Sequence, residues 1–328
     1  MIYYLPHNLI DKQQWDDLIT VAPEQQVYAL SWYLDVVSPG WEAIVAVDTA
    51  GRYEVVLPVP VRQKLRMRYV QQPLYCQQLG FYSRSGIGNQ AIVAQMLEVL
   101  YQRYSYVVSL PLNTANSFPE KLLHQQVSLQ NMATLYLSLS ERYPKLYANY
   151  SRDRKLNLKR AQRVKLSIAE SEDIEPLISF FKEEVAGRIY GGVGEWAYTT
   201  LRNLYRELKQ RGLARLLYTV DAAGNTNAGC LFVIFQKRII YIFNAASKDG
   251  RKYNGRTFML DYIIQQYAGQ DYLLDFESPA EEERAIVRVY AGFGATKAGF
   301  AVVHYNRLPP VIKLVRELRM RLVRRFLL

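Results

Sequence analysis

Apolar residues recur along the chain with two periods, which predict a mixture of helices and strands. Helical spacing predicts helices around Trp15 and at residues 29–37, 90–103, 143–163, 173–186, 195–212, 256–267 and 281–291. Runs rich in β-branched residues predict strands at 41–48, 53–62, 106–112, 134–140, 165–171, 214–221, 228–236, 238–247, 272–278 and 300–306. The sequence therefore predicts an α/β (α+β) fold with mixed sheets.

The order of these elements is roughly the same in both halves of the chain: helix, antiparallel strands, helix, strand. A chain of 328 residues exceeds what one core usually supports, so two domains are expected, at residues 1–130 and 131–307. Residues 308–328 place their larger apolar side chains along one stripe with arginines beyond it, which predicts a basic amphipathic helix. Such a helix suits an anionic membrane surface, and it equally suits docking on the parent domain or on a second subunit. No oligomeric state is predicted.

The net charge of +11 is concentrated in two segments. Residues 151–165 carry seven Lys and Arg against one Asp, and residues 308–328 carry six against one Glu, so the rest of the chain sums to zero. The helix at 143–163 is therefore either a solvated surface or a track for a polyanion, such as transfer RNA or a lipid-linked sugar precursor. No apolar run approaches a membrane span and no signal peptide is recognised, so a cytoplasmic protein is expected.

Cysteine and histidine are too few and too scattered to predict a disulfide framework or a metal site. Cys76 and Cys230 lie in unrelated apolar surroundings, and His7, His124 and His304 each stand alone. No metal is predicted.

The stretch from residue 275 to 296 combines a strand end, an acidic turn, a helix and the pair Gly292 and Gly294. Its "VYAGFGA" resembles the late signature of the GNAT acyltransferases, in which a tyrosine precedes a glycine turn. Together with "LLDFES" and the basic helix it is similar to the FemAB-like branch, the tandem-GNAT enzymes related to peptidoglycan-bridge aminoacyl transferases. The branch's "DFEGS" is matched at residues 275–277, whereas Pro279 and the following "AEEE" depart from it. The first half shares only element order, "SWYLDVV" and "LPVPVR".

The resemblance implies two GNAT-like domains in tandem, with the site in the second. It implies an N-acyltransferase, in GNAT terms an acetyltransferase-like enzyme, that moves an acyl or aminoacyl group from acyl-coenzyme A or aminoacyl-tRNA to an amine. The acceptor would be a small molecule or a cell-envelope precursor. Tyr290 occupies the position of the general acid that protonates the leaving thiol. The residue could equally be an aromatic on the buried face of its helix.

Such chemistry needs a binding site for the carrier's phosphates, a strand edge that can bond its amide arm, and a proton donor. The phosphate-binding site is expected at the start of a helix, because backbone N–H groups there bind anions. The residues at this position are Arg251, Asn254, Gly255, Arg256 and Thr257. The usual GNAT loop has small residues where Asn254 and Arg256 stand, so Arg256 would crowd a pyrophosphate unless it turns outward. The alternative is an ordinary charged turn.

The strand edge is expected at Asn244, Ala245 and Ala246, whose small alanines permit close approach of an added strand. These alanines could instead pack beneath a helix. Glu277 follows a central strand and is the candidate general base, or else a cap for the next helix. The rival function is a non-catalytic module that keeps the scaffold and binds nucleic acid or anionic lipid through its two basic surfaces.

Overall fold

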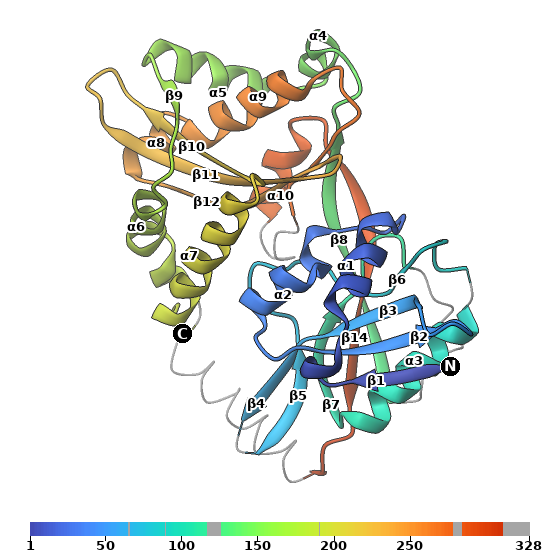
Figure 1. Cartoon of the computed structure of the whole chain (residues 1–328). Coiled ribbons are helices and arrows are strands. Elements are labelled where there is room, and N and C mark those ends of the chain that lie inside the picture. Colours follow the sequence, from blue (N-terminus) through green and yellow to red (C-terminus); the bar gives the residue numbers. More distant parts are fainter. Residues whose placement is uncertain (65, 89, 117–125, 190, 278–283, 311–328) are drawn as a thin grey trace. The chain divides into compact units, whose positions relative to one another are not determined.

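The computed structural model describes residues 1–310 except 65, 89, 117–125, 190 and 278–283 (Figure 1). The chain divides into two compact units, one formed by Met1–Met132 with the chain from Gly299 on, the other by Ala133–Ala298. The expected domains differ from these units after residue 298, because the last strand had been expected to stay with the second half. Nearly all of the basic amphipathic helix expected at 308–328 lies outside the described residues.

The first unit contains two sheets and three α-helices among its described residues. These elements are β1 (Ile2–Leu5), α1 (Lys12–Val21), α2 (Ser31–Val37), β2 (Glu42–Val47), β3 (Tyr53–Val59), β4 (Val61–Lys64), β5 (Met67–Gln71), β6 (Tyr82–Ser83), α3 (Gln90–Arg103) and β7 (Tyr106–Pro111). One sheet has the order β1-β2-β3-β6, and the other has the order β4-β5-β7-β14 within this unit. The hairpin of β4 and β5 includes residues 63, 64 and 67–71, for which no strand was expected, and it begins at Val61 within the expected strand 53–62.

Two long strands, β8 (Val127–Ser138) and β14 (Thr296–Asn306), each cross the boundary between the units. The second unit also holds α4 (Tyr143–Ala148), α5 (Arg152–Arg163), β9 (Ser167–Glu170), α6 (Glu175–Glu184), α7 (Glu195–Gln210), β10 (Ala214–Val220), β11 (Thr226–Phe235), β12 (Arg238–Ala246), α8 (Lys248–Lys252), α9 (Gly255–Tyr267), β13 (Leu273–Asp275) and α10 (Arg284–Ala291). Its strand order is β8-β13-β12-β11-β10-β9, antiparallel except for the parallel pair of β12 and β13.

Helices cover both faces of the second unit's sheet, with α5 and α9 on one face and α6 and α7 on the other (Figure 1). Helix α7 shows why the sequence forms this layer, because its buried residues recur every three or four positions. They are Ala197, Tyr198, Leu201, Leu204, Tyr205 and Leu208. This stripe packs on the sheet, whereas the other residues of α7 are at least partly exposed. The α/β fold with mixed sheets is confirmed.

Two expected elements have a finer structure. The helix at 143–163 is interrupted at 149–151 and forms α4 and α5. The segment expected as a loop before residue 256 contains the short helix α8, which Ser247 caps by accepting a hydrogen bond from the Gly250 N–H at 3.1 Å. In the described part of the chain, no helix is both long and apolar enough to cross a bilayer.

Candidate active site

A cavity of about 240 Å³ lies in the second unit where α5, β12, α9 and α10 meet. The residues that line it come from four separate parts of the sequence. They are Arg154, Asn157, Tyr241, Gly250, Arg251, Asn254, Arg256, Thr257, Leu260, Ile286, Val289 and Tyr290. Three arginines and no acidic residue line the described wall, so the cavity favours an anionic ligand.

Strand β12 has an open edge beside this cavity. Its parallel pairing with β13 ends at Ile240 opposite Asp275, although β12 continues to Ala246. A β-bulge shifts the register with β11 between the pairs Leu231–Phe243 and Phe232–Tyr241. A bulge bends a strand and increases its twist, which accounts for the divergence of the two parallel strands. In the described residues, the last six positions of β12 therefore have no strand partner on the β13 side.

The residues expected at this edge lie within that open segment. Ala245 and Ala246 are buried, and they pair with Gly229 and Ala228 of β11 on the other side. Asn244 is half-buried, and its Oδ1 accepts a hydrogen bond of 3.0 Å from Arg256 Nη1. The carbonyl of Ala246 is partly engaged, because Arg251 Nη1 donates to it at 3.3 Å.

Helix α9 begins with uncapped backbone donors that face the cavity region. Asn254 adopts left-handed backbone angles, φ 64° and ψ 35°, and its side chain does not cap the helix. No hydrogen bond from the N–H groups of residues 255–257 is found within the described chain, whereas the N–H groups of Arg251 and Asn254 donate to Ser247 O and Arg251 O. In the described chain, the amides without an acceptor are thus those of the first turn of α9.

Gly255 allows α9 to start this close to the sheet. A Cβ atom there would lie 2.6 Å from Thr219 Oγ1 and 2.9 Å from Ala228 Cβ. Only glycine brings the first turn of α9 onto β10 and β11 without moving one of them.

The arginines of the cavity differ in their partners. Arg251 is committed to Glu184, with 2.5 Å between Nη2 and Oε2, which lowers the pKa of the Glu184 carboxyl through the hydrogen bond. Arg256 is exposed, lines the cavity and donates from Nη1 to Asn244 Oδ1 at 3.0 Å. Arg154 is half-buried and donates from Nη1 to Thr257 Oγ1 at 3.0 Å.

Arg154 is the residue that sequence reasoning did not single out. Burial lowers the pKa of its guanidinium, and within the described chain no carboxylate forms an ion pair with it. The only signal in the sequence was its membership of the basic helix. A partly desolvated cation without an acidic partner is what an anion-binding site requires.

The glycine turn after α10 holds α5 in place. Gly292 O accepts a hydrogen bond of 2.8 Å from the Ser151 N–H, and Ser151 in turn caps α5 by accepting from the Arg154 N–H. A Cβ atom at Gly292 would lie 3.0 Å from Arg154 Cγ and 2.9 Å from Ser151 Oγ. The turn that follows Tyr290 therefore positions the N-terminus of α5, and with it Arg154.

Tyr290 lies in the wall of the cavity and is half-buried. Its ring stacks on Phe276, with 4.8 Å between centroids, and meets Tyr241 edge-on at 6.1 Å. Tyr290 therefore packs against other aromatic rings, as the structural alternative expected, and it also lines the cavity.

Glu277 is placed differently from Tyr290. It has a positive φ of 58°, its N–H donates to Asp275 Oδ1 at 2.9 Å, and it is absent from the described wall of the cavity. Asp275 itself is 1% exposed and bonds Arg238 Nη1 at 3.1 Å and Thr134 Oγ1 at 2.9 Å. Burial raises the pKa of Asp275 despite the nearby Arg238 cation. The structure thus brings Tyr290, but not Glu277, together with the arginines and α9.

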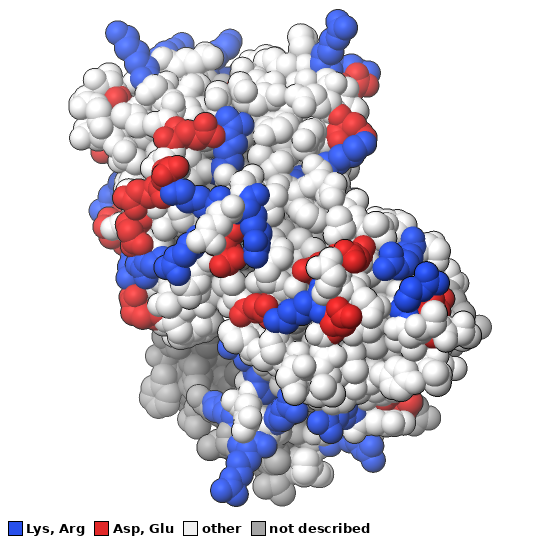
Figure 2. Space-filling model, viewed as in Figure 1, with Lys and Arg blue, Asp and Glu red and all other residues white. Residues whose placement is uncertain are grey.

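The remaining charges of the basic segment lie on the surface. Figure 2 shows Lys and Arg side chains projecting at the end of the second unit that carries α4 and α5. Of the two tyrosines that could stack on bases, Tyr150 is buried, packs edge-on against Phe293 and donates to Asp261 Oδ1 at 3.0 Å. Tyr147 is half-buried and lies under the Lys155 ammonium.

Comparison with known proteins finds one family model that matches part of the chain and solved structures with a similar fold. A family model described as an acetyltransferase (GNAT) domain matches residues 145–284. The crystal structure of FemX is 13% identical with a TM-score of 0.63, covering 93% of this chain and 98% of that one. A tandem GNAT protein from the clavulanic acid biosynthesis pathway is 15% identical with a TM-score of 0.53, covering 94% and 99%. A conserved protein of unknown function from Bacteroides thetaiotaomicron is 8% identical with a TM-score of 0.57, covering 90% and 97%. No curated protein matches the sequence.

Proposed function

We propose that this protein is an N-acyltransferase, because an acetyltransferase (GNAT) family model matches residues 145–284 and the chain is similar in fold to FemX and to a tandem GNAT protein over nearly its whole length. It transfers an acyl group from a phosphate-bearing thioester carrier, acyl-coenzyme A, to an amine. The observation that carries the proposal is that Tyr290, the first turn of α9 and Arg154 line one cavity beside the open edge of β12.

Each part of this site has a chemical task. The amides of residues 255–257 and the Arg154 guanidinium hold the carrier's phosphate, since both donate hydrogen bonds to anionic oxygens. The edge of β12, at Asn244, Ala245 and Ala246, bonds the amide arm of the carrier as an added strand would. Arg251 supports this edge through Ala246 O, and Asn254 sets the turn that opens α9.

Acyl transfer then proceeds by attack of the amine on the thioester carbonyl. Tyr290 donates its phenolic proton to the departing sulfur as the carbon–sulfur bond breaks. The attacking amine gives up its proton to solvent, because Glu277, the expected general base, lies outside the described wall of the cavity.

The test of this function is a panel of donors. Coenzyme A, acetyl-coenzyme A and an aminoacyl-tRNA acceptor-stem mimic are added to the protein, and thermal unfolding and thiol release in the presence of amines are measured. A ligand at ~100 times its dissociation constant adds ~2.7 kcal/mol to native stability. Stabilisation by coenzyme A with thiol release supports the proposal. Stabilisation by the tRNA mimic alone moves the donor to aminoacyl-tRNA, and a flat panel contradicts an enzyme of this class.

The rival function is supported by the outer face of α5. Lys159 and Arg163 are exposed there, and no ion pair with an acidic residue is found for either within the described chain. A non-catalytic module would use this face for nucleic acid or anionic lipid, in the cytoplasm or peripherally at the membrane. Binding of tRNA or anionic vesicles that falls steeply with salt, without thiol release from any donor, would favour this function.

A further inference from the structure

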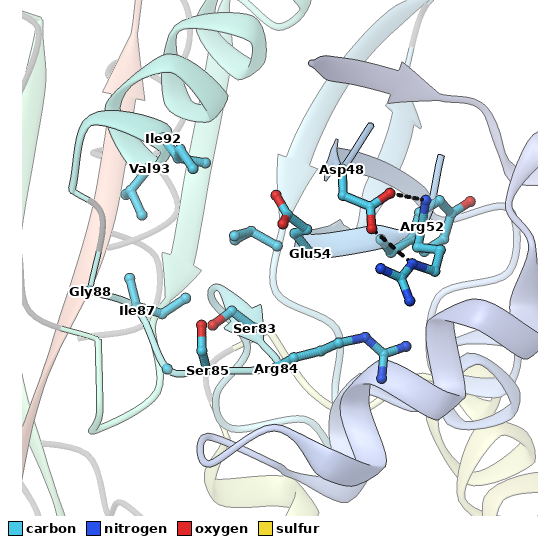
Figure 3. Close-up of a pocket in the computed structure, with 13 residues that line it drawn as sticks. Asp48, Arg52, Glu54, Ser83, Arg84, Ser85, Ile87, Gly88, Ile92 and Val93 are labelled. Atoms are coloured by element: carbon cyan, nitrogen blue, oxygen red, sulfur yellow. Dashed lines mark hydrogen bonds and ion pairs between the residues drawn. The ribbon is translucent and has the colours of Figure 1, made fainter. Parts of the chain in front are cut away.

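A second and larger cavity, of about 650 Å³, lies in the first unit between the β2–β3 turn, β6 and the start of α3 (Figure 3). Its volume is within the range of small-molecule sites. The lining residues are Asp48, Arg52, Tyr53, Glu54, Val55, Ser83, Arg84, Ser85, Gly86, Ile87, Gly88, Ile92 and Val93. The proposed acyl transfer uses none of them.

Ser83 is the first sign that this cavity is built for a ligand. The residue is 2% exposed, and its hydroxyl has no hydrogen-bond partner in the described structure. Its pairing with Val55 fixes it at the end of β6, where it forms part of the cavity wall. A buried polar group left without a partner costs about 1–3 kcal/mol, which a ligand that bonds the hydroxyl would recover.

The loop beside Ser83 is preformed. The buried carboxylate of Glu24 accepts a hydrogen bond of 2.9 Å from the Ile87 N–H, and Gly86 takes a φ of +81°. Gly88 N–H donates to Gly86 O at 2.9 Å, which closes the turn. Within the described chain the N–H groups of Ser85 and Gly86 donate to no acceptor.

The charged groups of the cavity differ in whether they already have partners in the protein. Asp48 is satisfied by its own turn, because it accepts from the Ala50 and Arg52 N–H groups at 2.8 and 2.9 Å and from Arg52 Nε at 2.8 Å. It therefore orients Arg52 and leaves the two terminal nitrogens of that side chain available. No ion pair of Glu54 or Arg84 is found among the described residues.

Figure 3 shows how these groups are disposed. The guanidinium groups of Arg52 and Arg84 lie on the same side of the view, the Glu54 carboxylate extends from the centre toward α3, and the hydroxyls of Ser83 and Ser85 lie on the side away from the two guanidinium groups. Such a cavity offers cationic donors at one end and an anionic acceptor at the other. Its apolar wall is formed by Val55, Ile87, Ile92 and Val93.

From this arrangement we propose that the first unit binds a small aliphatic zwitterion of the amino-acid or short-peptide type. The carboxylate of the ligand binds Arg52 and Arg84, its ammonium group binds Glu54, and the Ser83 hydroxyl forms a further hydrogen bond with the ligand. Arg52, Glu54 and Arg84 are all exposed, and a ligand with both charges pairs with all three, whereas a simple anion or a simple cation would face a like charge.

The test is isothermal titration calorimetry of the full chain with three matched probes: 6-aminohexanoate, hexanoate and hexylammonium. 6-Aminohexanoate is expected to bind at least tenfold more tightly than hexanoate or hexylammonium. In Glu54→Gln, 6-aminohexanoate should bind no more tightly than hexanoate. In Arg84→Gln, it should bind no more tightly than hexylammonium. Ser83→Ala should weaken the binding of 6-aminohexanoate. Glu98→Gln and Lys64→Gln, which change exposed charges outside the cavity, should leave both advantages intact.

Equal affinity for the zwitterion and hexanoate, no binding of any probe, or the same loss in all variants would overturn the proposal. Arg154→Gln, which changes the other cavity, should leave probe binding unchanged, so this result stands or falls separately from the acyltransferase function. Thermal unfolding of every variant establishes that the chain is folded.

Discussion

The guanidinium of Arg154, on α5, donates a hydrogen bond of 3.0 Å to Thr257 Oγ1 in the first turn of α9. This contact joins a helix that sequence reasoning treated as a separate basic surface to the turn that it treated as the phosphate site. Thr257 is buried and Arg154 is half-buried, so the cation stays beside the uncapped amides of α9. The position of α5 against Gly292 keeps it there.

Replacing Arg154 by glutamine should weaken binding of the phosphate-bearing donor by about 10- to 100-fold, the effect of losing ~1.5–3 kcal/mol from a hydrogen bond to a charged group. The free energy of unfolding should not fall, because the variant removes a partly desolvated cation without an acidic partner. Calorimetric titration with coenzyme A measures the affinity. Arg160→Gln, at an exposed position of the same helix, is the matched control and should bind normally.

Replacing Tyr290 by phenylalanine should reduce kcat far more than donor affinity. The ring keeps its stacking on Phe276 while the proton donor is lost, and general acid catalysis typically contributes ~10²–10⁴-fold. Steady-state thiol release and coenzyme A binding are measured on the same preparation. Tyr262→Phe, on α9 but outside the cavity wall, should leave both unchanged. Equal losses in kcat and affinity for Tyr290→Phe would argue against a proton-donor role.

The elements that local patterning determines could be read from the sequence. The apolar stripe of α7 predicts a helix that buries one face, and the continuous apolar runs of β10, β11 and β12 predict strands that are buried on both faces of the sheet. The interruption at 149–151 could not be read, because it depends on Gly292 O, which bonds the distant Ser151 N–H. The hairpin of β4 and β5 was hidden by its charged residues.

The candidate site was predictable only in part. The residues at the start of α9 and Tyr290 were named from a local motif, and both now line one cavity. Arg154 was missed because its role depends on a contact 103 residues away in sequence. Arg251 was expected to bind the carrier's phosphates. Its ion pair with Glu184 could not be predicted from the sequence, because the two residues meet only when α6 packs on the sheet.

Replacing Gly255 by alanine should destabilise the protein, because the new Cβ would approach Thr219 Oγ1 to 2.6 Å and Ala228 Cβ to 2.9 Å. Overpacking of this kind typically costs ~1–3 kcal/mol. It should also displace the first turn of α9 and weaken coenzyme A binding. Urea unfolding and calorimetry measure the two effects. Gly187→Ala is the control, since a Cβ there meets nothing within 4 Å. Unchanged stability of Gly255→Ala would show that the contact is not tight.

The buried Asp261 should make stability depend on pH. It is 5% exposed and accepts hydrogen bonds from Tyr143, Tyr150 and Gln265, and no cation pairs with it among the described residues. Burial raises its pKa. The folded state then binds the proton more tightly than the unfolded state, so the contribution is present below the unfolded pKa, ~3.9, and is lost as pH rises through the folded pKa.

Asp261→Asn keeps an acceptor for the tyrosines and removes the titration, so its free energy of unfolding relative to the native protein should rise as pH increases from about 4 toward neutrality. Urea unfolding at a series of pH values measures this difference. Asp271→Asn, at an exposed position that pairs with Lys237, should show no such rise. A difference between Asp261→Asn and the native protein that stays constant with pH, or falls, would mean that this carboxyl is not strained by burial, and that its three hydrogen bonds fully offset the loss of water.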